Sequence, residues 1–212
     1  MFLLRINRLI KKHIENGLVL YILLGFIYIL GIIIGATLLK RMNIAESSFF
    51  LKYSNPFFKN IMNNDVGEYL VFKSSLSSNL LFVILLYLLG LLGFGFILIP
   101  ILILIKGSGL GLTVAYLVKD LGIKGIFISI LGIYPQNLLM IPGIIGVGAI
   151  TLSMSLSFRS GSKTRLIKGK GFTNLKEYSI LIGLFTFVII LGVLIEGFIS
   201  PIFLKLALNY LY

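Results

Sequence analysis

The feature that most constrains the fold is an apolar run near the N-terminus, Leu18–Leu39, whose 22 residues include no charged side chain. As a helix rising about 1.5 Å per residue, it would extend about 33 Å, enough to cross about 30 Å of hydrocarbon. Hydrophobic residues make up 58% of the whole chain and charged residues only 12%, which is far more apolar than a soluble domain requires. We therefore predict an all-α, polytopic integral protein of the cell membrane.

Basic residues beside the apolar segments predict how the chain is oriented. The N-terminal segment 1–17 carries four basic residues against one acid, and the segment 158–177 carries six against one. Because Lys and Arg are enriched in cytoplasmic loops, both segments are predicted to be cytoplasmic. Membrane topology and contact with anionic lipid headgroups account for the basic residues behind the formal charge of +12. No nucleic acid is therefore expected as a partner.

A polar stretch, residues 40–79, follows the first apolar run and is predicted by alternation to be an extracytoplasmic loop. The sequence Ser-Asn-Pro at residues 54–56 is typical of a helix start, with Asn as the cap and Pro at the first helical position. Phe57 and Phe58 belong to an aromatic side of this helix, which would lie on the membrane surface. Two interpretations stay open: the aromatic rings anchor the loop to lipid, or they form a docking surface for an extracytoplasmic partner.

Two further apolar segments, Leu80–Ile105 and Tyr178–Ile195, are predicted to span the membrane, with Glu196 at the outer end of the second. Between them, residues 106–143 combine charged and amide side chains with many glycines and two prolines. In hydrocarbon, each unsatisfied polar group costs several kcal/mol. Such a stretch therefore has to pack against other helices or line a cavity.

The path of this central region has two interpretations. Gly107–Val118 is too short for an ordinary span, and Gly125–Leu156 is too long. Either the chain crosses twice, with the second helix broken near Pro135, or both pieces are re-entrant, with Tyr134–Asn137 as the turn of a hairpin. We favour two crossings, because a proline removes a backbone donor and disfavours helix at the preceding residue. Residues 1–212 then form a single membrane domain of about five spans, with a cytoplasmic N-terminus and an outer C-terminus.

Four polar residues of the central region are candidates for interactions. Lys119 and Asp120 would form a local ion pair at the outer interface. Gln136 and Asn137 lie beside Pro135 and would bond to neighbouring helices. The alternative is a substrate site, because transporters build such sites from broken helices.

The sequence offers no constellation for catalysis. The single histidine, His13, lies in the basic N-terminal segment, and the chain has no cysteine and no H-E-x-x-H motif. We therefore expect no catalytic residue, no cofactor and no metal site. The glycines of Gly107–Gly111 lack the remainder of a phosphate loop and favour close helix packing instead. Gly31 and Gly35 form a G-x-x-x-G that would permit the same, although chance explains it equally well.

Three segments in this order resemble the stage II sporulation protein M family. They are KGSGLGLTVAYLV at 106–118, YPQNLLMIPG at 134–143 and EGFISPIF at 196–203. The resemblance covers nearly the whole chain and implies a non-enzymatic component of the engulfment machinery in endospore formation, on the mother-cell side of the septum. It further implies that the protein organises stage II sporulation proteins D and P, which degrade septal peptidoglycan, and it leaves homo-oligomerisation open. The alternative function is a membrane transporter or permease subunit with a site around Pro135 to Asn137.

Overall fold

The structure is a computed structural model that describes residues 2–41, 68–159 and 175–200. Within these ranges every regular element is helical, which confirms the all-α prediction. The helices are α1 (Phe2–Arg41), α4 (Glu68–Leu91), α5 (Gly95–Leu121), α6 (Ile123–Gly132), α7 (Tyr134–Arg159), α8 (Leu175–Leu194) and a π-helical turn, η1 (Ile195–Ile199).

Five of the described helical segments are long and apolar enough to cross a membrane, and the prediction of a polytopic bundle is confirmed. They are Gly17–Arg41, Tyr69–Leu91, Gly95–Lys119, Tyr134–Ser157 and Leu175–Ile199. Large apolar side chains such as Phe26, Ile84 and Phe187 are exposed on the outside of the bundle. Such a surface suits lipid rather than water.

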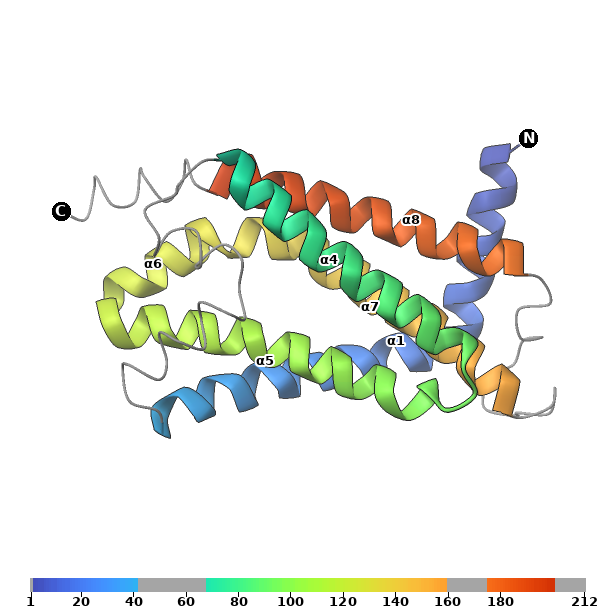
Figure 1. Ribbon diagram of the computed structural model, residues 1–212, viewed down its shortest axis with the longest axis horizontal. Helices are drawn as coiled ribbons and strands as arrows, with labels where there is room; N and C mark the ends of the chain where they lie inside the picture. The colour runs from blue at the N-terminus through green and yellow to red at the C-terminus, as the bar shows by residue number, and fades with distance from the viewer. Residues whose placement is uncertain (1, 42–67, 160–174, 201–212) are drawn as a thin grey trace.

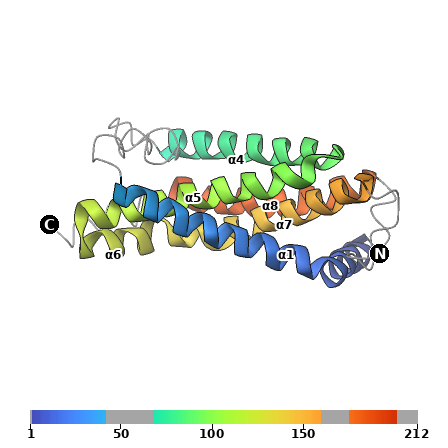
Figure 2. The ribbon, with the colours of Figure 1, turned by 90° about the horizontal axis from the view of Figure 1, so that it is seen from below.

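Helix α7 lies at the centre of the bundle, since 72% of its spanning window is buried, against 28–33% in the other four spans. Its neighbours run alongside it, while the first part of α1 turns away from the long axis (Figure 1 and Figure 2). Small residues on α7 allow the neighbouring helices to come close to it. A Cβ atom at Gly146 would overlap the Phe185 ring, and one at Gly143 would press on Ile189. Neighbouring helices can therefore pack against α7 without large side chains holding them apart.

The chain reverses at residues 92–94, between α4 and α5, so the prediction of one span over Leu80–Ile105 is wrong. The reversal needs close backbone contact, because a Cβ atom at Gly95 would overlap the carbonyl oxygen of Leu89. It also needs a distant partner: the Ser155 hydroxyl on α7 donates a 2.7 Å hydrogen bond to the carbonyl oxygen of Leu92. This bond gives a carbonyl group at the turn the partner that regular helix would otherwise supply.

A second reversal occurs at Gly122, whose φ of 59° lies in the left-handed region that favours glycine. Helix α6 then leads back along α5 to a break at Ile133, and α7 begins at Tyr134 with Pro135 in its first turn. The predicted break near Pro135 is therefore confirmed. The alternative of a re-entrant hairpin turning at Tyr134–Asn137 is wrong, because these residues start the long helix α7. The first crossing of the central region was predicted to begin at Gly107, but helix α5 begins at Gly95.

Helix α4 begins at Glu68, so residues 68–79 belong to a helix of the bundle and not to the predicted outer loop. Their polar side chains explain the error, because Ser75 and Asn79 are buried inside the protein rather than exposed to water. The proposed surface helix, with Phe57 and Phe58, lies outside the described residues.

Helices α1 and α5 meet along four glycines, which we call the glycine seam: Gly31 and Gly35 on α1, Gly107 and Gly111 on α5. A Cβ atom at any of them would overlap a backbone oxygen of the opposite helix. The two backbones therefore touch directly, as small-residue motifs permit in membranes. This confirms close packing for Gly107 and Gly111 and decides in its favour for Gly31 and Gly35, whereas a Cβ atom at Gly109 would meet nothing within 4 Å.

Candidate functional site

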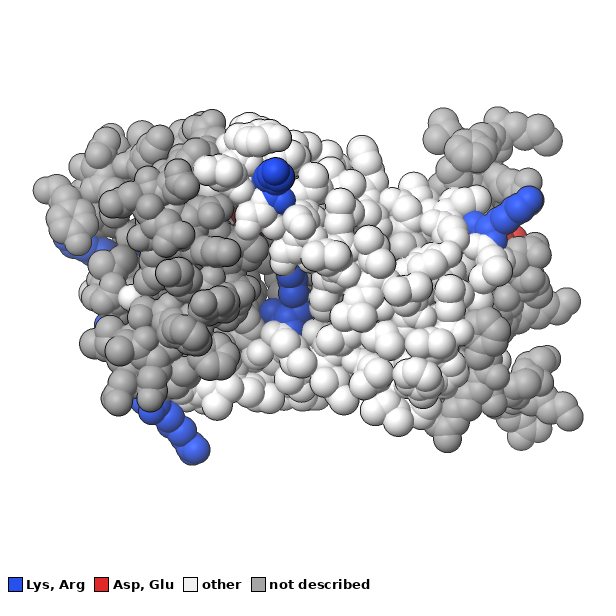
Figure 3. All heavy atoms as spheres, viewed as in Figure 1, with Lys and Arg blue, Asp and Glu red and all other residues white. Residues whose placement is uncertain are grey.

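A polar cavity of about 290 Å³ opens between the helices in the described part of the bundle. Five elements, α1, α4, α5, α7 and η1, contribute to its wall. Its polar lining residues are Ser75, Ser78, Asn79, Lys106, Gln136, Asn137 and Glu196. Figure 3 shows basic atoms in a hollow near the middle of the molecule, and the described residues directly beside them are uncharged.

Glu196 contributes an acidic group to this cavity from the π-helical turn η1. Its side chain is only 4% exposed, and the Ser75 hydroxyl on α4 donates a hydrogen bond to its Oε2. The next residue, Gly197, allows η1 to approach α4 closely, since a Cβ atom at this position would press on Phe72. The prediction that Glu196 marks an outer end is therefore wrong: the span continues to Ile199, and the carboxylate faces the interior.

Lys106 contributes a basic group from near the middle of α5. Its Nζ atom lies 5.2 Å from the centroid of the Phe82 ring on α4, within reach of a cation–π interaction. The sequence interpretation placed Lys106 at a membrane edge, and this is wrong because α5 continues through it. A charged side chain inside a span is costly unless another group compensates it. Glu196, which lines the same cavity, is the acidic group that can provide this compensation.

The predicted pair at the helix break, Gln136 and Asn137, lies at the same cavity. Ser200 donates a 2.6 Å hydrogen bond to Oε1 of Gln136, which joins α7 to the end of η1. This is the interhelical role that the sequence predicted for Gln136. Asn137 acts more locally, because its Nδ2 donates a 2.8 Å hydrogen bond to the carbonyl oxygen of Ile133 at the break. Pro135 lies between the break and these two residues.

Of the remaining predicted residues, the structure describes only the side chain of Lys119, which is not part of the cavity wall. Lys119 is exposed near the end of α5, and the side chain of Asp120 lies outside the described residues, as do Phe57 and Phe58. Their proposed ion pair and docking surface therefore stay predictions.

Sequence reasoning missed the polar lining residues of α4, which include Ser75 and Asn79. These two are spaced four apart, which places them on one face of a helix. Asn79 Nδ2 donates a 2.9 Å hydrogen bond to the carbonyl oxygen of Ser75, so the two polar groups form one buried unit. The spacing could have revealed that unit, had the segment been recognised as part of a span.

The arrangement combines one acid, one base and several neutral polar groups in an otherwise apolar bundle. It can hold a charged or polar group away from water, with opposite charges available on different helices. It also joins the two irregular helical regions of the described chain, the α6–α7 break and η1, through the bond between Ser200 and Gln136.

Comparison with known proteins places the chain in a family. No curated protein and no solved structure matches it significantly. The model of one family, described as stage II sporulation protein M, matches residues 24–201. That range includes four of the five described spans completely, most of the first, and every residue that lines the polar cavity. The chain therefore belongs to the stage II sporulation protein M family.

Proposed function

We propose that this protein is a non-enzymatic membrane scaffold of the engulfment machinery in endospore formation. In this role it recruits or organises the peptidoglycan hydrolases, stage II sporulation proteins D and P, at the mother-cell side of the septum. The observation that carries the proposal is the family match across residues 24–201. The tight helix packing supports it, since the glycine seam and the small residues of α7 suit a rigid platform.

Affinity purification from sporulating cells in mild detergent tests this function directly. Both hydrolases should be recovered with the tagged protein in amounts well above those with an unrelated membrane protein carrying the same tag. Their absence, under conditions that keep the tagged protein intact, would contradict the scaffold.

A second candidate, a transporter or permease subunit, has one observation in its favour: the helix break at Pro135 borders a cavity with charged residues. Transporters build substrate sites at such breaks. This function predicts recovery of a cytoplasmic ATPase or a measurable flux of substrate, in place of wall hydrolases.

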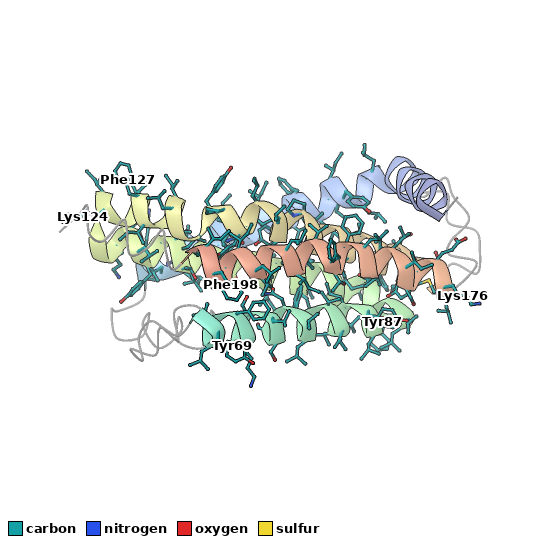
Figure 4. All side chains as sticks on the ribbon, turned by 90° about the horizontal axis from the view of Figure 1, so that it is seen from above. Tyr69, Tyr87, Lys124, Phe127, Lys176 and Phe198 are labelled. Atoms are coloured by element: carbon teal, nitrogen blue, oxygen red, sulfur yellow. The ribbon has the colours of Figure 1, made fainter. Side chains whose placement is uncertain are left out.

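The orientation can be tested at two exposed lysines. Figure 4 shows Lys124 on α6 and Lys176 on α8 at opposite ends of the bundle. Because Lys176 belongs to the basic segment 158–177, we expect its end to be cytoplasmic. The native chain has no cysteine, so Lys124→Cys should react with an impermeant thiol reagent in intact cells, while Lys176→Cys should react only after lysis. Labelling of Lys176→Cys but not Lys124→Cys in intact cells would invert the topology.

The loop after α1 is the proposed docking site for a partner. Replacing Phe57 and Phe58 with serine should release the hydrolases from the purified complex, because aromatic residues at interface centres carry much of the binding energy. The variant should still accumulate in the membrane, since neither residue belongs to a described span. Co-purification is the measurement, with immunoblotting to normalise the amount of bait.

A matched control is Phe127→Ser, which alters an exposed aromatic ring on α6. It should leave hydrolase recovery unchanged. Wild-type recovery with the Phe57→Ser/Phe58→Ser variant would exclude this loop as the main docking site and favour lipid anchoring as the role of its aromatic residues.

A further inference from the structure

The polar cavity lies where two interruptions of regular helix meet. Helix α8 widens into the π-helical turn η1 at Glu196, and the α6–α7 junction breaks just before Gln136. The bond from Ser200 to Gln136 joins the two interruptions. Single π-helical turns are frequent at functional sites, and broken helices in membranes often surround bound ligands. The location therefore favours a binding site over simple packing.

One wall of the cavity offers hydrogen-bond acceptors. Asn79 is only 7% exposed, and its Nδ2 is occupied by bonds to the carbonyl oxygen and the hydroxyl of Ser75. Its Oδ1 is buried without a partner in the described structure. The same Ser75 hydroxyl donates to Glu196, which brings this open acceptor and a carboxylate into one network. A group with several N–H donors and a positive charge would satisfy both.

Another part of the wall offers donors. Lys106 lies over the Phe82 ring and carries up to three N–H donors, which match a carboxylate or a phosphate. Among the described lining residues, Lys106 and Glu196 are the charged ones, so their formal charges cancel. A ligand with a net charge would leave an uncompensated charge inside the membrane, whereas a zwitterion would not.

We propose that this cavity binds a small zwitterion, with its primary ammonium group at Glu196 and Asn79 and its carboxylate or phosphate at Lys106. The volume of about 290 Å³ is at the small end of the range for ligand pockets, which favours a molecule of few heavy atoms or a lipid headgroup. This activity goes beyond the scaffold role and does not depend on it.

The test uses the full-length protein in detergent, fused to a fluorescent protein, with its thermal stability as the readout. A ligand that binds the folded state raises the unfolding temperature by an amount that grows with the ratio of its concentration to its Kd. Glycine, β-alanine or glycerophosphoethanolamine, each a zwitterion without net charge at neutral pH, should raise it, whereas acetate alone and methylamine alone should not. An equal rise with either single-charge compound, or no rise with any of the three zwitterions together with no retained lipid, would overturn the proposal.

Variants then locate the binding. The double variant Lys106→Met/Glu196→Gln removes both charges together and so avoids leaving one uncompensated. It should weaken binding about 10- to 100-fold or more, because hydrogen bonds to charged groups have been removed. Lys73→Met, an exposed change on α4, should bind as the wild type does. Undiminished binding by the double variant would place the ligand elsewhere and overturn the proposal.

A lipid source is distinguished by native mass spectrometry of protein extracted from vesicles with and without phosphatidylethanolamine. Retention of that lipid by the wild type, and its loss in the double variant, would identify the zwitterion as a headgroup. Stabilisation of delipidated protein by the free compounds would identify a soluble ligand instead. Either result supports the site, and the scaffold proposal is tested separately by hydrolase recovery.

Discussion

Replacing Lys106 by methionine, or Glu196 by glutamine, is expected to destabilise the protein more than replacing both together. Each single change leaves one charge of the cavity without an opposite charge inside the bundle, and a lone charged side chain within a span costs about 2.5–3.5 kcal/mol. The double change leaves no charge, and neutral replacement of a buried pair is often nearly neutral in stability. The measurement is the temperature at which half of a fluorescent fusion remains monodisperse in mild detergent, combined into a double-mutant cycle.

A matched control is Lys73→Met, which removes an exposed charge on α4 and should leave that temperature almost unchanged. If the effects of the two single changes simply add in the double variant, Lys106 and Glu196 act independently, and their attraction across the cavity does not stabilise the fold. Membrane abundance should follow the same order as thermal stability, since unstable variants are degraded.

The overall architecture could be predicted because apolar length is decisive in a membrane. The first span, the helix break near Pro135 and the total of five crossings all followed from segment lengths and from proline chemistry. The reversal between α4 and α5 could not be predicted in this way. It lies inside an apolar run, and it depends on a hydrogen bond from Ser155 to Leu92, which are far apart in sequence. No residue near Leu92 in the sequence indicates that Ser155 is its partner.

The candidate site was only partly predicted for the same reason. Gln136, Asn137 and Glu196 were singled out because polar residues stand out against apolar neighbours. Lys106 and Asn79 were each placed at an edge of the membrane, because the apolar run between them was taken as a single span. Once α4 and α5 are separate helices, both residues move into the bundle and meet across the cavity. Because this one boundary was wrong, the sequence analysis did not bring Lys106 and Asn79 together in one site.

A second large loss of stability is expected when alanine replaces glycine in the glycine seam between α1 and α5. A Cβ atom at Gly35 would overlap the backbone of Ser108, and one at Gly111 would overlap the backbone of Ile32. Backbone atoms cannot yield as a flexible side chain can, so the two helices would have to separate. Gly35→Ala is expected to cost about 1–3 kcal/mol, and the double change Gly35→Ala/Gly111→Ala more than either alone. Thermal stability of the detergent-solubilised fusion measures this loss.

Gly183→Ala provides the control, because a Cβ atom at this α8 position would meet nothing within 4 Å. Alanine also favours helix more than glycine by up to about 1 kcal/mol, so this variant should be as stable as the wild type or more so. The expected changes in stability have opposite signs at Gly35 and Gly183. The comparison therefore separates the effect of steric overlap from that of helix propensity. If Gly35→Ala were as stable as the wild type, helices α1 and α5 would not be in backbone contact. Since Gly107 lies one residue from Lys106, the position of that lysine in the cavity would then need a support other than the seam.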